Sequence, residues 1–101
     1  MEIVISLIRK MSLASLEKKA ALQILSYLYR NESATRTALR KNIKAAMETV
    51  YSALGVLKEL GLVEESVDDS FAGTKEAYLS EKGMIIAKRL VEIEEILESE
   101  E

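Results

Sequence analysis

Residues 57–83 read LKELGLVEESVDDSFAGTKEAYLSEKG, and this stretch decides the fold. Gly61 follows an apolar helical pattern and is the expected stop, because glycine most easily adopts the left-handed conformation beyond a helix end. Strand-like patterns then cover residues 62–67 and 75–79, separated by residues 68–74, which are rich in turn formers. The stretch therefore predicts the end of one helix, a β-hairpin with a fairly long tip, and the start of another helix.

The helix after the hairpin is expected to begin at Ser80, whose hydroxyl is a favourable N-cap, with Glu81 near the positive end of the helix dipole. We expect this helix to continue to about Glu98. Apolar residues recur within it at the spacing of a heptad-like packing seam. The residues of this seam are Ile86, Leu90, Ile93 and Leu97.

Upstream of the hairpin, the apolar periodicity predicts three helices. The third runs from about residue 46 to residue 60 and directly precedes Gly61. The second is short and begins at Thr35, whose hydroxyl can cap the first turn. Its outward-facing residues are basic: Arg36, Arg40 and Lys41. The first clear helix starts at about residue 13 or 16 and continues to Arg30.

Two helices joined by a tight turn, the second longer and followed by a hairpin, form the arrangement of a winged helix-turn-helix. Proline is absent and glycine occurs four times, so most of the chain should be helical. The major groove of DNA admits one α-helix, and its base edges distinguish all four base pairs. We therefore predict a mainly α fold with a small β-hairpin, whose third helix reads the groove while the second braces it.

Four short blocks carry a resemblance to a known family. They are TRTAL at 35–39, ETVY at 48–51, LKELGLVE at 57–64 and YLSEKG at 78–83. From about residue 20 to residue 98, the chain resembles the MarR-type winged-helix regulators and their small archaeal relatives. The resemblance implies a winged helix-turn-helix transcriptional regulator that docks on DNA without covalent chemistry.

Carried over position by position, the resemblance places the start of the third helix near the groove. The residues that would contact DNA there are Met47, Glu48, Thr49, Tyr51 and Ser52. The basic residues that would hold the phosphate backbone or lie on the wing are Arg36, Arg40, Lys41, Lys44 and Lys75. The alternative without a DNA-binding role is that these are ordinary surface residues, with Tyr51 packed beneath the wing. The chain departs from the family at Ala46, where a Ser or Thr cap is usual, and at the acidic wing residues Asp68 and Asp69.

The charge distribution favours the same region. The chain has a net charge of −3, but six of its 17 acidic residues lie in the last ten positions. Residues 30–58 hold six basic and two acidic residues, a local net charge of +4. Positive charge is thus concentrated where the DNA-reading motif is expected, although solvated helix faces are the simpler explanation of charge alone.

Composition excludes several classes of chemistry. The chain has no Cys and no His, which removes disulfides, thiol nucleophiles, imidazole bases and the usual zinc sites. No paired carboxylates, nucleophile constellation or phosphate-binding glycine loop is visible, so we expect neither an enzyme nor a cofactor. No apolar run has the length of a transmembrane helix, and the start lacks the order of a signal peptide. We therefore expect a cytoplasmic protein, and abundant Lys and Glu fit a thermophile source.

Apolar residues near both ends of the sequence bear on whether the protein forms a dimer. If residues 2–11 are helical, an apolar stripe forms from Ile3, Leu7, Ile8 and Met11, whereas an extended segment would align Ile3, Ile5 and Leu7. One winged-helix core does not readily cover both this stripe and the C-terminal seam, so we expect a homodimer; the alternative is that both fold back on their own domain. The predicted parts are an N-terminal extension (1–12), a winged-helix core (13–79) and a C-terminal dimerisation helix (80–101).

The favoured function is a sequence-specific regulator that binds double-stranded DNA as a homodimer. Two alternatives stay open: a winged-helix protein–protein interaction module, and a chromosomal protein that binds DNA without sequence preference. A small-molecule effector is common in the resembling family, but the sequence shows no signature for one.

Overall fold

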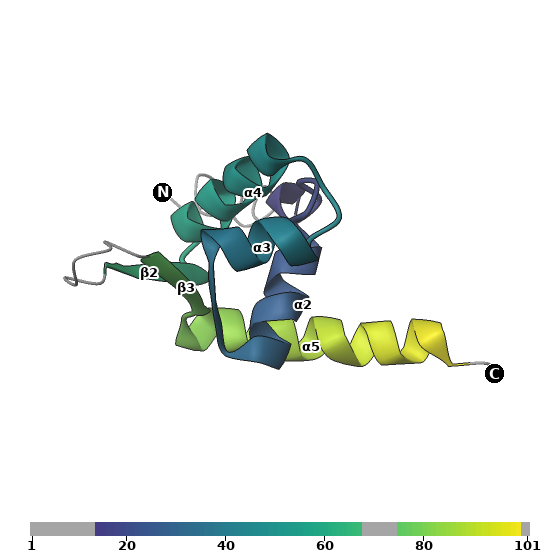
Figure 1. Ribbon diagram of the computed structural model, residues 1–101. Coiled ribbons are helices and arrows are strands. Elements are labelled where there is room, and N and C mark those ends of the chain that lie inside the picture. The colour runs from purple at the N-terminus through teal and green to yellow at the C-terminus, as the bar shows by residue number, and fades with distance from the viewer. Residues whose placement is uncertain (1–13, 68–74, 100–101) are drawn as a thin grey trace.

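The computed structural model describes residues 14–67 and 75–99 (Figure 1). The described residues form four helices and a small antiparallel sheet. In chain order the elements are α2 (Ala21–Asn31), β1 (Ser33–Thr35), α3 (Arg36–Asn42), α4 (Met47–Glu59), β2 (Val63–Val67), β3 (Lys75–Leu79) and α5 (Glu81–Glu98). The sheet has the order β1-β3-β2, so the second strand of the hairpin lies in its centre. The predicted class, mainly α with a hairpin wing, is confirmed.

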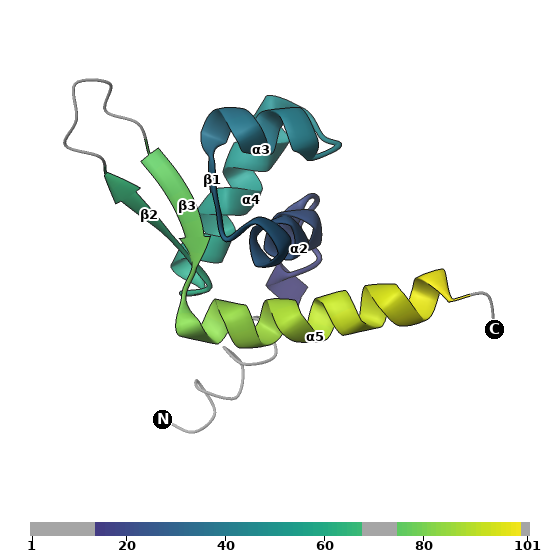
Figure 2. The same cartoon turned by 60° about the horizontal axis from the view of Figure 1, so that its bottom comes forward.

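Helix α2 lies at the centre of the molecule, with α3 and α4 on one side and α5 on the other (Figure 2). Its apolar face consists of Ile24, Leu25 and Leu28, whose side chains are fully buried. Leu39 of α3, the apolar stripe of α4 and Ala77 of β3 complete the core around it. Removing this apolar surface from water is the main stabilising term of a domain of this size. The core therefore fixes how α3 and α4 are presented to solvent.

The first described helix begins later than the apolar pattern predicts. Ala20 has a φ of 75°, a left-handed conformation that no α-helix continues through, and α2 starts at the next residue. Ala14 and Ser15 are helical, but residues 16–20 form turns and a bend, in which the backbone N–H of Glu17 donates to Ala14 O and that of Lys18 donates to Ser15 O. Ala20 itself is buried in the core, so tertiary packing overrides the high helix propensity of this segment. The predicted start at residue 16 is therefore wrong, and the alternative of one continuous helix from residue 13 is wrong as well, because the turns at 16–20 interrupt it.

Strand β1 is absent from the sequence prediction. It pairs antiparallel with β3, with Ser33 opposite Tyr78 and Ala34 opposite Ala77. Three residues are too few to show an alternating pattern, which is why the sequence signal for this strand is missing. The segment links the end of α2 directly to the start of α3, so its pairing with β3 connects the helix-turn-helix to the sheet.

Three of the predicted helix boundaries are marked by the expected local signals. The backbone N–H of Ala38 donates to the Thr35 hydroxyl at 3.1 Å, which caps α3. Gly61 has a φ of 75° just after α4. The backbone N–H of Gly83 donates to the Ser80 hydroxyl at 3.0 Å, which caps α5. Each of these signals is local, because a cap satisfies backbone groups within its own helix turn.

Candidate nucleic-acid interface

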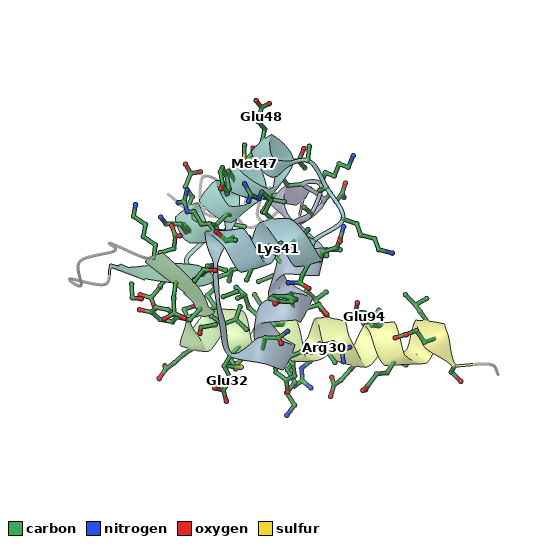
Figure 3. The ribbon with its side chains drawn as sticks, in the orientation of Figure 1. Arg30, Glu32, Lys41, Met47, Glu48 and Glu94 are labelled. Atoms are coloured by element: carbon green, nitrogen blue, oxygen red, sulfur yellow. The ribbon has the colours of Figure 1, made fainter. Side chains whose placement is uncertain are left out.

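Helix α4 presents one face to the core and the opposite face to solvent. Val50, Ala53, Leu54 and Leu57 are buried against α2 and the sheet. Met47, Glu48 and Ser52 are exposed on the outside. Figure 3 shows Met47 and Glu48 at the outer end of α4, on the side of the molecule away from α5. An exposed helix supported in this way has the dimensions needed to enter a major groove, which is about 12 Å wide.

Three basic residues lie on α3 and in the turn that leads to α4. Arg40, Lys41 and Lys44 are all exposed. The Arg40 guanidinium lies 3.8 Å from the Met47 sulfur, which brings the last turn of α3 against the start of α4. The backbone N–H of Lys44 donates to Gln23 Oε1 at 3.2 Å, so the turn between the helices is tied to α2. Of the predicted phosphate-binding residues, Arg40 therefore borders the start of α4, and Lys44 lies in the turn that precedes it.

Two further lysines, which sequence reasoning missed, lie on the other border of α4. Lys18 and Lys19 line an open hollow of about 270 Å³ together with Glu48, Thr49 and Ser52. They belong to the turns before α2, which bring this segment next to the start of α4. The apolar pattern predicts one continuous first helix, and that prediction does not bring these lysines near α4. The proximity depends on the break at Ala20, and no pattern in the sequence marks that break.

Arg36, the first residue of α3, is held by an ion pair that the sequence analysis did not predict. Its Nε and Nη2 atoms donate to the two carboxylate oxygens of Glu65 on β2, at 2.9 and 2.8 Å. The guanidinium also lies over the ring of Tyr51, 5.1 Å from its centroid, which is cation–π geometry. Lys58 Nζ of α4 donates to Glu65 Oε1 at 2.9 Å. Two of the six basic residues counted between residues 30 and 58 are therefore paired with one acidic residue of the wing.

The carboxylate of Glu65 is charged at all ordinary pH values. The hydrogen bond from Arg36, ahead of that from Lys58, lowers the pKa of Glu65 from 4.5 to about 2, against the opposing effect of burial. The hydrogen bond to Glu65 correspondingly raises the pKa of Arg36, which is protonated in any case. Tyr51, a predicted DNA contact, is half-buried beneath the Arg36 guanidinium.

The wing contributes one predicted contact within the described residues. Lys75 is exposed at the start of β3 and pairs with Val67 across the hairpin. The predicted wing tip with Asp68 and Asp69 lies outside the described residues.

The predicted dimerisation seam divides into two parts on α5. Ile86 and Leu90 are half-buried against their own core. Ile93 and Leu97 are 51% and 77% exposed in the C-terminal half of α5, whose end extends beyond the rest of the domain (Figure 1). Two further apolar residues, Ile85 and Ile96, are 62% and 72% exposed, and the sequence analysis did not include them. The predicted N-terminal stripe of Ile3, Leu7, Ile8 and Met11 lies outside the described residues.

Helix α5 is fastened to α2 just before it leaves the domain. The hydroxyl of Ser26, which is almost fully buried, donates to Glu94 Oε1 at 2.6 Å. Arg30 Nη2 lies 3.3 Å from the same oxygen, and Figure 3 shows Arg30 and Glu94 side by side between the two helices. This contact fixes the direction in which the exposed end of α5 projects.

Other kinds of site find no support in the described part of the chain. Among residues 14–67 and 75–99, no group of three or more acidic side chains is placed to hold a metal ion. None of the described helices combines the length and the apolar character that crossing a bilayer requires.

Comparison with known proteins gives likenesses of structure. No family model matches the sequence, and none of the curated proteins matches it. A transcriptional regulator homologue from Pyrococcus horikoshii OT3 superposes with a TM-score of 0.71 at 21% identity, over 90% of this chain and 91% of that one. The putative transcriptional regulator ytfH from Salmonella typhimurium gives a TM-score of 0.77 at 15% identity, over 89% and 80%. The F-93 protein of SSV1 gives 0.65 at 29% identity, over 77% and 88%. Together with the order of its elements, these likenesses show that the chain has a winged helix-turn-helix fold.

Proposed function

We propose that this protein is a DNA-binding transcriptional regulator of the MarR type, with α4 inserted in the major groove of a specific site. The observation that carries the proposal is the position of the basic residues: exposed Arg40 contacts one side of the start of α4 and two exposed lysines lie on the other, with further lysines on α3 and in the turn. These basic residues are Lys18, Lys19, Arg40, Lys41 and Lys44. Phosphate strands run on both sides of the major groove, so cations on both borders of an inserted helix match that arrangement.

Three exposed residues and the half-buried Thr49, all in the first half of α4, supply the base-reading chemistry. Thr49 and Ser52 carry short hydroxyls that can donate to or accept from base edges, and Glu48 can accept from the amino group of cytosine. Met47 offers an apolar contact to a thymine methyl group. Phosphate contacts set the register of the helix, and these four side chains supply the sequence preference. No covalent step is involved.

We further propose that the regulator acts as a homodimer, joined through the exposed end of α5. The exposed side chains of Ile93 and Leu97, with that of Ile96 beside them, give the C-terminal end of this helix an uncovered apolar surface. A second copy related by a two-fold axis would cover this surface with the same residues. Two copies of α4 would then meet half-sites separated by about one helical turn of DNA.

The likeness to proteins described as transcriptional regulators supports this proposal at the level of the fold. A protein–protein interaction module is the second candidate. The observations that favour it are the exposed acidic side chain of Glu48 at the start of α4 and the pairing of Arg36 and Lys58 with Glu65. Both reduce the positive charge available to DNA.

Selection from a random pool of short DNA duplexes tests the proposal. A regulator enriches an inverted repeat with half-sites centred about one helical turn apart, and a selected duplex then outcompetes random duplex for binding. Binding without enrichment would instead indicate a chromosomal protein that lacks sequence preference. Failure of the folded protein to retain any duplex at low salt would contradict DNA binding and favour the interaction module.

A further inference from the structure

Glu65 connects three parts of the winged helix at one point. It lies on β2, in the root of the wing, and its side chain is only 3% exposed. Arg36 reaches it from the first turn of α3, and Lys58 reaches it from the last turn of α4. One carboxylate therefore links the wing to both helices of the helix-turn-helix.

The Arg36 guanidinium is restrained on two sides. The carboxylate of Glu65 engages both Nε and Nη2 in a bidentate arrangement, which fixes the plane of the group. The ring of Tyr51 lies against its face. The Arg36 side chain nevertheless remains 38% exposed, and it retains N–H donors that Glu65 does not use. It is thus a fixed cation with part of its surface open to solvent.

We propose that Glu65 is a positioning residue of the DNA-binding surface, which holds Arg36 in place against Tyr51 so that its free donors meet a DNA phosphate. The inference rests on the proposed function, since it assigns a role within the same surface. A free arginine side chain loses several rotatable bonds when it contacts a phosphate, and this loss weakens binding. In this protein Glu65 and Tyr51 have already ordered the side chain before DNA arrives.

If Glu65 instead hindered DNA binding, its neutralisation would change the affinity in the opposite direction. If the carboxylate only repelled phosphates or withheld Arg36 and Lys58 from them, neutralising it would tighten DNA binding, because the surface would gain net positive charge. If Glu65 positions Arg36, neutralising it loosens the guanidinium and weakens binding despite that gain. The sign of the change in affinity therefore separates the two roles.

The experiment compares Glu65→Gln with Glu64→Gln in duplex-DNA binding by fluorescence anisotropy. Glu64 is the neighbouring residue of the same strand and is exposed, so its substitution removes the same charge without touching Arg36. We expect Glu65→Gln to weaken binding about three- to tenfold, the range expected for ordering one long side chain. Glu64→Gln should leave binding unchanged or tighten it slightly. Tighter binding by Glu65→Gln would overturn the proposal.

Two further variants show whether Glu65 acts through Arg36. In an Arg36→Ala background, Glu65→Gln should cause no additional weakening, because the residue that it positions is gone. Additive weakening would contradict the proposal. Arg36→Lys retains the charge and the ion pair but loses the planar, bidentate group. It should weaken binding to a similar extent even if Glu65→Gln fails to fold, and unchanged affinity in Arg36→Lys would overturn the proposal.

The outcomes distinguish this inference from the proposed function. If the unsubstituted protein binds no DNA at low salt, the proposed function fails. If that protein binds DNA and Glu65→Gln binds as tightly or more tightly, only the positioning role fails. Circular dichroism and thermal unfolding of each variant confirm that affinities are compared between folded proteins.

Discussion

Gly83, in the first turn of α5, lies directly against the backbone of Leu62, at the end of the link from α4 to the wing. A β-carbon at position 83 would come within 1.9 Å of the Leu62 carbonyl oxygen and 2.8 Å of its carbonyl carbon. The same carbonyl accepts a hydrogen bond from the backbone N–H of Ser80, and the Ser80 hydroxyl donates to Gly61 O at 2.6 Å. The blocks LKELGLVE and YLSEKG, separate in sequence, therefore meet at one junction.

Gly83→Ala should destabilise the protein because backbone atoms at this junction would have to move apart. Overpacking of this kind costs about 1–3 kcal/mol, and an obstruction by backbone places the effect at the upper end. For a chain of 101 residues each kcal/mol lowers the melting temperature by roughly 4–8 °C. Thermal and urea unfolding measure the change. Gly55→Ala is the control, since nothing lies within 4 Å of a β-carbon there.

The Gly55 control has its own expected sign. Alanine in the exposed face of α4 should stabilise the protein by about 0.5–1 kcal/mol, because glycine loses more backbone entropy in a helix. Equal and small effects of the two alanine substitutions would contradict the close contact described between Gly83 and Leu62.

Ser26→Ala tests the connection between α2 and α5. The Ser26 hydroxyl donates to Glu94 Oε1 at 2.6 Å, and its loss should cost about 1 kcal/mol. The effect stays modest because the Glu94 side chain is 44% exposed and water can replace the missing donor. Urea unfolding measures it. Ser33→Ala, at an exposed hydroxyl 3.3 Å from Glu76, is the matched control and should change stability by less than about 0.5 kcal/mol; equal losses in both would refute a specific role for Ser26.

The ion pairs of Glu65 predict a defined dependence of stability on pH. The pKa of Glu65 is about 2 in the folded protein, below its ordinary value of 4.5. A lowered folded-state pKa contributes stability that is fully present above the ordinary value and is lost as the pH falls from about 4.5 toward 2. The shift corresponds to roughly 3 kcal/mol. Since Arg36 and Lys58 are 38% and 42% exposed, screening by solvent reduces this to on the order of 1–2 kcal/mol.

Unfolding by urea at a series of pH values between 7 and 2.5 measures this contribution. The stability difference between the unsubstituted protein and Glu65→Gln should be largest above pH 5 and should shrink as the solution becomes more acidic. Glu64→Gln supplies the comparison, because it removes a carboxylate from the same strand. If Glu65→Gln and Glu64→Gln lose stability in parallel with falling pH, the ion pairs of Glu65 do not contribute as the structure indicates.

The exposed end of α5 predicts a dimer that apolar-to-charged substitutions disrupt. Ile93→Glu combined with Leu97→Glu should shift the 11.3-kDa chain from dimer to monomer, because two carboxylates per chain would be buried without partners. Sedimentation equilibrium measures the mass. Met84→Glu is the control, since Met84 is an exposed apolar residue on the same helix but outside the seam. A monomeric unsubstituted protein, or a double variant that remains dimeric, would contradict this interface.

The fold could be predicted to the extent that its signals are local. Thr35, Gly61 and Ser80 end or begin helices through their own backbone geometry and nearby hydrogen bonds, and the sequence pattern locates all three. The break at Ala20 and strand β1 could not be found in this way. The break accompanies packing of Ala20 in the core, and the strand exists because β3, more than forty positions away, pairs with it.

In the candidate site, too, features set by local sequence could be predicted and those set by distant contacts could not. Periodicity identifies which side chains of α3 and α4 face outward, and the exposed positions of Arg40, Lys41 and Met47 follow from it. It does not reveal that Lys18 and Lys19 lie beside Glu48, because their position depends on the turns before α2. Nor does it distinguish Glu65 from Glu64, adjacent residues of one strand whose environments differ only through contacts with distant helices.

The central claim is that DNA binds to the surface formed by α3, the turn and α4. Fluorescence anisotropy of a labelled duplex at several salt concentrations tests it most directly, with Arg40→Ala/Lys44→Ala compared against Lys82→Ala/Lys88→Ala. Both pairs remove two exposed positive charges, the first beside α4 and the second from α5 on the opposite side. We predict salt-dependent binding whose slope becomes shallower by about one for each phosphate that the variant no longer neutralises, in the first variant only. Equal slopes for both variants, or no binding at low salt, would contradict the claim.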